Sequence, residues 1–253
     1  SQDFTNLITS ENEYFLCYYF NARSNIFIKV SQGTSIKGFT TQEIRSAIFF
    51  IPSIPEQDKI TNLLRLIDDR IQTQNKIIKE LNVLKTNFSK RIFTHQLKFK
   101  DENGNYFPEW DNNKLGDLTE IFDGTHQTPN YVEEGIPFYS VEQLTSNNFN
   151  NTKYVTQQVF EKENKRVKLE KGDILMTRIG DIGTSKHIDW EINASFYVSI
   201  VVIKQSPQFN SKFIHHFIGS IFFQNELWSR TIHVAFPKKI NLGEISNCLI
   251  WLP

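Results

Sequence analysis

A long stretch without proline or glycine, from Glu56 to Glu102, constrains the fold of this chain more than any other feature. Within it, apolar residues recur in alternating steps of three and four, with two polar interruptions at Gln74 and Lys85. The apolar members of this register are Ile60, Leu64, Ile67, Ile71, Ile78, Leu81, Phe88 and Ile92. Such spacing puts one apolar stripe along a helix and predicts a partner helix that covers it, as in a coiled coil. A helix of about 40 residues would reach roughly 60 Å, so we expect a rigid spacer with a docking surface.

The beginning and end of this helix carry recognisable signals. Ser53 can cap the helix, Glu56 lies three residues further on as in a capping box, and Pro55 is tolerated in a first turn. After Gln96 the sequence becomes a polar run that is typical of a turn or linker. We therefore expect the long helix in residues 53–97 and a linker in residues 98–110.

The chain also contains a repeat. The segment IKGFTTQEIRSAIFFIP, Ile36–Pro52, matches PKKINLGEISNCLIWLP, Pro237–Pro253. Lys37 corresponds to Lys238 at an offset of 201 residues, which is too long for a solenoid and indicates two copies of one domain. Residues 1–52 would then be the C-terminal part of a first copy, and residues 111–253 a complete second copy. We expect the sequence to be a piece of a longer protein.

The second copy has the pattern of an α+β domain. Short β-like runs alternate with turns, and the expected strands are Lys114–Phe122, Pro137–Tyr139, Asp173–Arg178, Thr184–Ile188 and Phe196–Lys204. One helix is expected over Lys212–Trp228, where apolar residues follow helical spacing. The sequence thus predicts a curved sheet or small open barrel with a few helices, joined to the long helix.

Three polar loops of this domain hold the candidate binding residues. They are Asp123–Pro129, Thr177–Thr184 and Ile232–Lys239, and each is rich in side chains that read base edges or hold phosphates. The candidates for nucleic-acid contact are Thr125, His126, Gln127, Thr128, Arg178, Lys186, His233, Lys238 and Lys239. Solvated surface turns have a similar composition, and this alternative stays open.

The charge of the chain is the main objection to a nucleic-acid binder. Lys and Arg together number 28, as do Asp and Glu, so the formal net charge is zero, whereas a simple non-specific binder would usually be basic. The charge is unevenly distributed, however. Residues from Glu56 to Lys100 include ten basic and five acidic residues, a net charge of +5.

No catalytic or metal-binding constellation is recognisable in the sequence. Phosphate-binding loops, nucleophile elbows and metalloprotease motifs are absent. Cys17 and Cys248 do not form a zinc motif, and we expect two reduced, mostly buried thiols. His215 and His216 are expected as core or surface residues. No apolar run approaches the roughly 18 residues of a membrane span and no signal peptide is recognisable, so we expect no membrane contact and a cytoplasmic protein.

The motifs together resemble one family, over essentially the whole chain. Pro52-x-x-Pro55-Glu56-Gln57 enters the heptad helix, ILMTRIGDIGT (Ile174–Thr184) follows Gly172-Asp173, and Phe236-Pro237-Lys238-Lys239-Ile240 precedes the terminal apolar motif. With Phe107-Pro108-Glu109-Trp110 and Lys114-Leu115-Gly116-Asp117, this order resembles that of the specificity subunits of type I restriction–modification enzymes.

The resemblance implies a non-catalytic, sequence-specific DNA-recognition subunit. In such subunits two target-recognition domains are held apart by two helices that form an antiparallel coiled coil, and each domain reads half of a bipartite site in double-stranded DNA. The helices dock methyltransferase subunits, and restriction subunits complete the nuclease. The chain itself would bind no cofactor, and S-adenosylmethionine, ATP and Mg would belong to the partner subunits. These subunits would also supply much of the phosphate contact, which softens the objection from charge.

Two departures from the family pattern leave alternatives open. The first part of the first domain and the second helix are absent from the sequence, so the stripe on the long helix lacks its usual intramolecular partner. The stripe would then pair with a second copy of the chain or with a separate fragment. A coiled-coil scaffold without DNA contact is the alternative function, and it agrees with the neutral net charge. We find no residues that support a standalone enzyme.

Overall fold

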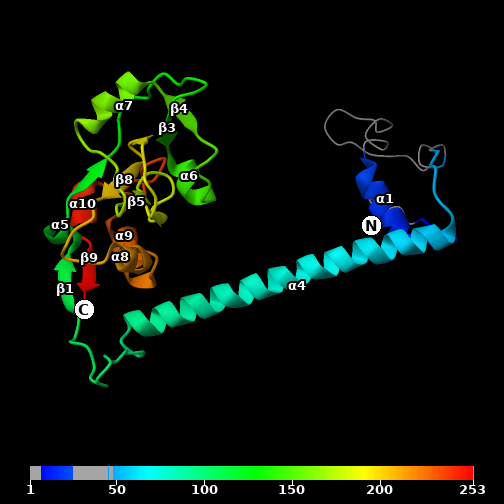
Figure 1. The fold of residues 1–253 in the computed structure, drawn as a ribbon, viewed down its shortest axis with the longest axis horizontal. Helices are drawn as coiled ribbons and strands as arrows, with labels where there is room; N and C mark the ends of the chain where they lie inside the picture. The colour runs from blue at the N-terminus through cyan, green and yellow to red at the C-terminus, as the bar shows by residue number, and fades with distance from the viewer. Residues whose placement is uncertain (1–6, 25–44, 46–47, 253) are drawn as a thin grey trace. The chain divides into compact units, whose positions relative to one another are not determined.

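The computed structural model describes residues 7–24, 45 and 48–252, and it divides the chain into two compact units, residues 1–84 and 85–253. Each unit is described by itself (Figure 1). Most of the repeated segment Ile36–Pro52 lies outside the described residues. The predicted domain boundaries stay a prediction, because the division between the units falls inside the long helix.

The first unit contains a short helix, α1 (Glu13–Ala22), bonded to the start of the long helix α4 (Ile54–Phe93). The side chain of Asn12 caps α1 by accepting a hydrogen bond from the backbone N–H of Phe15 at 2.9 Å. Gln57 is buried, and its Oε1 accepts from the backbone N–H of Asn12 at 3.0 Å while its Nε2 donates to the carbonyl of Pro52 at 2.9 Å. The hydroxyl of Tyr18 also donates to the carboxylate of Asp68. These bonds fix α1 on the N-terminal part of α4.

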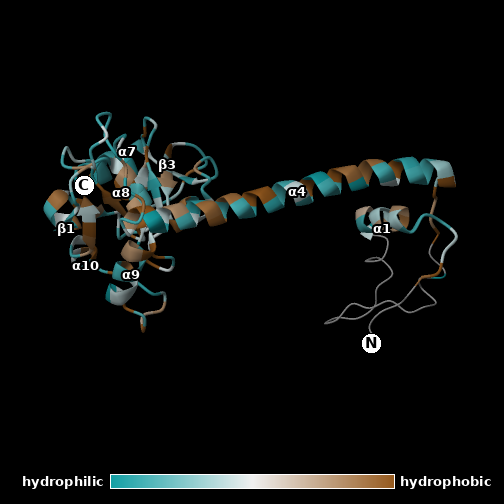
Figure 2. Cartoon of the chain, turned by 90° about the horizontal axis from the view of Figure 1, so that it is seen from below, coloured by the Kyte–Doolittle hydropathy of each residue, from teal (hydrophilic) through white to brown (hydrophobic). Residues whose placement is uncertain are grey.

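The predicted long helix is confirmed, because α4 is one helix of 40 residues. Ile60 and Leu64 are half-buried, whereas the register residues that follow are exposed, namely Ile67, Ile71, Ile78, Leu81 and Phe88. Figure 2 shows apolar and polar segments alternating along this helix. At the C-terminal end, Ile92 packs against the core of the second unit. The apolar stripe is thus present and largely uncovered, and its pairing with another helix stays a prediction.

The second unit contains three open sheets. A two-stranded antiparallel sheet joins its two ends, β1 (Asp111–Lys114) and β9 (Leu249–Leu252). The largest sheet has the antiparallel order β2-β8-β5-β6, with strands Ile121–Asp123, Ile200–Ile203, Ile174–Thr177 and Ser185–His187. The third has the order β4-β3-β7, with strands Lys153–Val155, Ile136–Tyr139 and Ser195–Phe196, of which β3 and β7 are parallel.

The central strands β5 and β8 explain where the core lies. Every residue of both strands is buried, because apolar clusters cover both faces of the sheet. Alternate residues point to opposite faces of a strand, so Ile174 and Met176 enter one cluster while Leu175 enters the other. Helices α8 (Ser211–Ile218) and α9 (Ile221–Arg230) contribute to the first cluster. The remaining helices are short, namely α5 (Leu115–Leu118), α6 (Val141–Ser146), α7 (Gln157–Asn164) and α10 (Leu242–Ser246).

The α+β prediction is confirmed, whereas three expected elements are each divided in two. The run Lys114–Phe122 contains α5 between β1 and β2, because Leu115 and Leu118 both turn into the core. The run Phe196–Lys204 turns between β7 and β8, where the N–H of Ile200 donates to the carbonyl of Tyr197 at 2.9 Å.

The third divided element is the expected helix Lys212–Trp228. It is interrupted at Gly219 and Ser220, and Ser220 caps α9 by accepting from the N–H of Phe223. A barrel is not formed, since the sheets of the described residues remain open. The expectation for the cysteines holds for Cys248, which is buried, and is wrong for Cys17, which is exposed.

Candidate functional site

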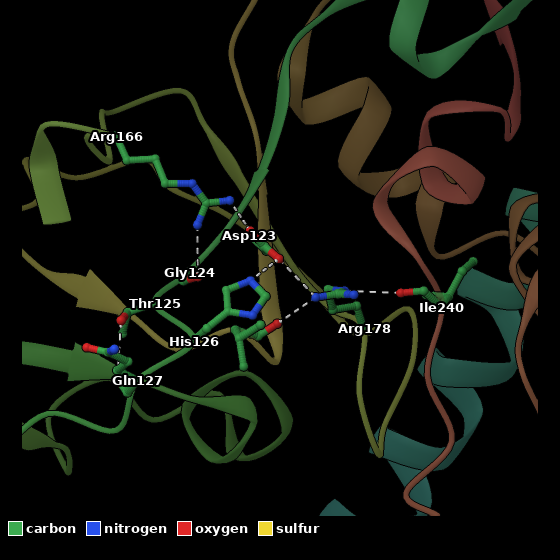
Figure 3. Close-up of polar contacts among 9 residues, drawn as sticks. Asp123, Gly124, Thr125, His126, Gln127, Arg166, Arg178 and Ile240 are labelled. Atoms are coloured by element: carbon green, nitrogen blue, oxygen red, sulfur yellow. Dashed lines mark hydrogen bonds and ion pairs between the residues drawn. The ribbon is translucent and has the colours of Figure 1, made fainter. Parts of the chain in front are cut away.

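A buried carboxylate, Asp123, lies at the end of β2 and is contacted by two arginines and a histidine (Figure 3). Its Oδ2 accepts from Nη1 of Arg178 at 3.1 Å and lies 2.9 Å from Nε2 of His126. Its Oδ1 accepts from Nη2 of Arg166, whose Nη1 donates to the carbonyl of Gly124 at 3.2 Å. A buried charge is tolerated only when it is paired and hydrogen-bonded, and Asp123 meets that condition.

The surroundings of Asp123 keep it ionised. Burial raises the pKa of its carboxyl group, but the hydrogen bonds and positive charge of Arg166 and His126 outweigh burial and hold the pKa below its ordinary value. For Arg178, burial lowers the pKa of the guanidinium and the charge of Asp123 opposes that change. An arginine remains protonated in proteins, so the pair is a charged one.

Arg178 connects all three candidate loops. It follows β5 and is only 7% exposed. Besides Asp123 of the first loop, its Nη1 donates to the carbonyl of Val198 at 3.1 Å, and its Nε donates to the carbonyl of Ile240, directly after the third loop, at 3.1 Å. The main chain repeats the link, because the N–H of Gly180 donates to the carbonyl of Lys238 at 2.8 Å. Segments distant in sequence are thereby joined at one side chain.

The first loop, Asp123–Pro129, separates buried from exposed candidates. Thr125 is buried, and its N–H donates to the carbonyl of Phe196 at 3.0 Å. The loop passes so close to this segment that a Cβ at Gly124 would lie 2.1 Å from the carbonyl oxygen of Phe196, which explains the glycine. His126, Gln127 and Thr128 are exposed, so their side chains can reach a ligand.

The third loop, Ile232–Lys239, presents its candidates to solvent. His233, Lys238 and Lys239 are all exposed. Nε2 of His233 lies 2.9 Å from the carbonyl oxygen of Trp228, and Nζ of Lys238 lies 5.0 Å from the centre of the Trp228 ring. A cation at this distance from an indole face is attracted to it. Trp228 therefore contacts His233 and Lys238, while both side chains remain exposed to solvent.

Lys186 lies apart from these contacts. It belongs to β6, and its Nζ donates to Oδ1 of Asn147 at 2.9 Å. Its ammonium also lies 5.8 Å from the ring centre of Trp190 and 5.9 Å from that of Phe149. These three partners are outside the three loops, so the structure does not join Lys186 to the Arg178 cluster.

Sequence reasoning missed two members of this cluster, Asp123 and Arg166. Asp123 was recognisable as the first residue of a candidate loop, but its partners were not. Arg166 is 43 residues away along the chain and lies between α7 and β5. No local pattern marks it, because its role follows from a tertiary contact.

Three other titratable side chains of this unit also have structural partners. Asp173 is buried and accepts from Nζ of Lys204 at 2.7 Å, whereas Asp181 accepts from the hydroxyl of Thr177 at 2.8 Å. His215 is half-buried, with Nδ1 lying 3.0 Å from Oγ of Ser185.

Among the described residues, no group of three or more His, Cys, Asp or Glu is placed to hold a metal ion. No helix in the described part of the chain is long and apolar enough to span a membrane.

Comparison with known proteins gives the family of the chain. The matching family model is the type I restriction modification DNA specificity domain, over residues 1–83 and 108–253. The type I restriction enzyme EcoBI specificity subunit of Escherichia coli is 24% identical over 271 residues, covering 96% of this chain and 56% of that protein. The type I restriction enzyme MjaVIII specificity subunit of Methanocaldococcus jannaschii is 24% identical over 231 residues, covering 85% of this chain and 54% of that protein.

The fold agrees with this assignment. The crystal structure of the type I restriction-modification system S subunit from M. genitalium matches with a TM-score of 0.62 and 16% identity, covering 96% of this chain and 62% of that one. The chain spans about half the length of the curated relatives it matches. Because the family model covers most of its residues, this chain belongs to the family of type I restriction modification DNA specificity domains.

Proposed function

We propose that this chain is a non-catalytic subunit that recognises a DNA sequence and directs methyltransferase and restriction subunits to a bipartite site. The observation that carries this proposal is the junction at Arg178, which holds three polar loops together in one domain. Recognition loops on a rigid scaffold are the usual means of reading a ligand. Membership of the specificity-domain family supports duplex DNA as that ligand.

The candidate residues divide into contacting and supporting groups. Exposed side chains at His126, Gln127 and Thr128 are proposed to meet the bases, because amides, hydroxyls and imidazoles hydrogen-bond to base edges. His233, Lys238 and Lys239 are proposed to meet bases or phosphates. Lys186 would contact a phosphate away from this cluster.

The buried candidates receive a supporting role in this proposal. Nε and Nη1 of Arg178 donate hydrogen bonds to acceptors inside the domain, the carbonyl of Ile240 and the carboxylate of Asp123. Thr125 is held in the first loop by its backbone hydrogen bonds. Both residues are buried, so their side chains are not presented to a ligand. We therefore assign both to the positioning of the loops.

The long helix supplies the assembly surface of the proposed subunit. Its exposed apolar register between Ile67 and Phe88 would pack against a second helix, from another copy of the chain or from a separate segment, and against the methyltransferase subunits. The partner subunits, in the cytoplasm, would supply S-adenosylmethionine, ATP and Mg. A scaffold without DNA contact is the second candidate, and the zero net charge together with this uncovered stripe favours it.

One experiment separates the two functions. The chain is expressed with its methyltransferase subunits, the methylated motif is determined by sequencing, and binding to a duplex with that motif is measured at several salt concentrations. Lys238→Ala should lower the slope of log affinity against log salt by about one if it contacts a phosphate. Gln127→Ala should cost about 1–3 kcal/mol of discrimination at one base pair.

The control is Gln158→Ala, which removes an exposed glutamine of α7 outside the three loops. It should change neither the salt slope nor the motif. Unchanged affinity and motif after replacement of all three loops would rule out DNA recognition by this domain and leave the scaffold.

A further inference from the structure

The third loop has an apolar tip that the proposed polar contacts do not explain. Val234 and Phe236 have relative exposures of 97% and 104%. Burial of such side chains stabilises a folded chain, so their complete exposure calls for an explanation. Single exposed apolar residues are ordinary, but two on one loop, with Ala235 between them and Pro237 following, form a continuous apolar tip.

The base of the loop is held firmly under this tip. The N–H of Ile232 donates to the carbonyl of Lys239 at 2.8 Å and closes the loop as a narrow hairpin. The N–H of Ile240 donates to the carbonyl of Arg178 at 3.0 Å, and the ring of His233 lies 4.2 Å from that of Trp228. Since these contacts fix both arms, the apolar tip is presented in an ordered position.

The charges around the tip favour a nucleic acid over a protein core. No acidic residue occurs from Thr231 to Gly243, whereas Lys238 and Lys239 directly follow the tip. Asp181, which lines a pocket together with Lys238, accepts a hydrogen bond from the hydroxyl of Thr177. The acidic residues nearest in sequence, Glu226 and Glu244, are both paired with Arg230. An apolar wedge beside basic side chains is the arrangement by which proteins unstack a base step while holding its phosphates.

We propose that the Val234–Phe236 tip inserts its apolar side chains between neighbouring base pairs of the bound duplex. This inference rests on the proposed DNA recognition and deepens it. Lys238 and Lys239 would hold the flanking phosphates, and Phe236 would replace the stacking that the separated bases lose. Specificity then includes the ease with which a base step opens, in addition to hydrogen bonds at base edges.

The test uses the assembled complex and duplexes of its own motif, with 2-aminopurine placed at one position at a time. Insertion unstacks this base, so the wild-type complex should raise its fluorescence at one base step that is separate from the base flipped out by the methyltransferase. Phe236→Ala should abolish that rise and weaken binding about tenfold or more, because an apolar contact is lost. Its salt slope should stay unchanged, because no phosphate contact is removed.

The matched control is Ile221→Ala, which removes an exposed apolar side chain from the first turn of α9 in the same unit. It should preserve both affinity and fluorescence. Wild-type fluorescence that stays low at every position other than the base flipped by the methyltransferase, or a Phe236→Ala variant with unchanged affinity, overturns the insertion. Intact DNA affinity with loss of methyltransferase binding would make the tip a protein contact instead.

The outcomes also separate this inference from the proposed function. If the wild-type complex shows no preference for any motif, DNA recognition fails and the insertion fails with it. If the motif is bound and Lys238→Ala alters the salt slope while Phe236→Ala changes nothing, recognition stands and the insertion alone is refuted.

Discussion

Replacing Arg178 by Met tests whether the buried guanidinium holds the three loops together. Methionine keeps most of the apolar length of the side chain but removes the bonds to Asp123, Val198 and Ile240. Hydrogen bonds that involve a charged group contribute about 1.5–3 kcal/mol each. Part of that sum is offset because the variant no longer buries the guanidinium.

The expected loss of unfolding free energy is about 3 kcal/mol. Breaking a buried ion pair costs about 3–5 kcal/mol, and the lower end applies because Asp123 keeps Arg166 and His126 as partners. With a denaturant dependence of about 2 kcal/mol per molar urea, the unfolding midpoint should fall by about 1–2 M.

Tryptophan fluorescence follows the unfolding of the unit that contains Arg178, residues 85–253. The chain has 4 tryptophans, all within residues 85–253, and they are Trp110, Trp190, Trp228 and Trp251. Arg166→Met is the control, because its side chain is 46% exposed and solvent screening reduces its pairing with Asp123 to less than about 1 kcal/mol. A midpoint for Arg178→Met no lower than that of Arg166→Met would refute the assignment of Arg178 as the junction.

The same network predicts a dependence on pH. The pKa of Asp123 is lower in the folded chain than its ordinary value, so its stabilisation is complete above the unfolded value of about 3.9. It is lost as the pH falls through the folded value. Asp123→Asn should therefore be less stable than wild type at neutral pH, and the difference should shrink below about pH 4 in urea titrations. A difference that persisted undiminished to the lowest pH would show that ionisation of Asp123 is irrelevant.

Three further outcomes are expected. Ile78→Glu combined with Leu81→Glu should abolish self-association or methyltransferase binding in size-exclusion chromatography, and should change the unfolding free energy of unit 85–253 by less than about 0.5 kcal/mol. Burial lowers the pKa of His215 to about 4, so its NMR signals should titrate near that pH, and stability should decline as the pH falls from about 6.5 towards it. A thiol reagent should label the exposed Cys17 quickly and the buried Cys248, whose pKa burial raises to about 12, only after unfolding.

The sequence predicted the long helix well because its signal accumulates over many turns. Short elements carry less information, as the run Lys114–Phe122 shows. Leu115 and Leu118 are three residues apart, which fits a single helical turn, while the neighbouring apolar residues also fit a strand. The single turn of helix forms because it places both leucines in the core.

The candidate loops were predictable, but the network that joins them was not. A polar loop with glycine or proline directly after an apolar run is visible in one sequence. The partners of Asp123 are not, because Arg166 and Arg178 lie 43 and 55 residues away along the chain. The sequence also could not show that Arg178 is buried, since an arginine beside a turn is more often exposed.

The chemistry of the junction bears on how such a domain could change its target. Two of the three acceptors of Arg178 are the main-chain carbonyls of Val198 and Ile240, which every amino acid supplies. The scaffold therefore needs Asp123 and Arg178 but no particular side chain at the exposed position Gln127. Substitutions there can alter the donors and acceptors offered to a base without breaking a bond that holds the loops. It follows that specificity and stability reside on different residues of the same loop, which allows the first to vary while the second is kept.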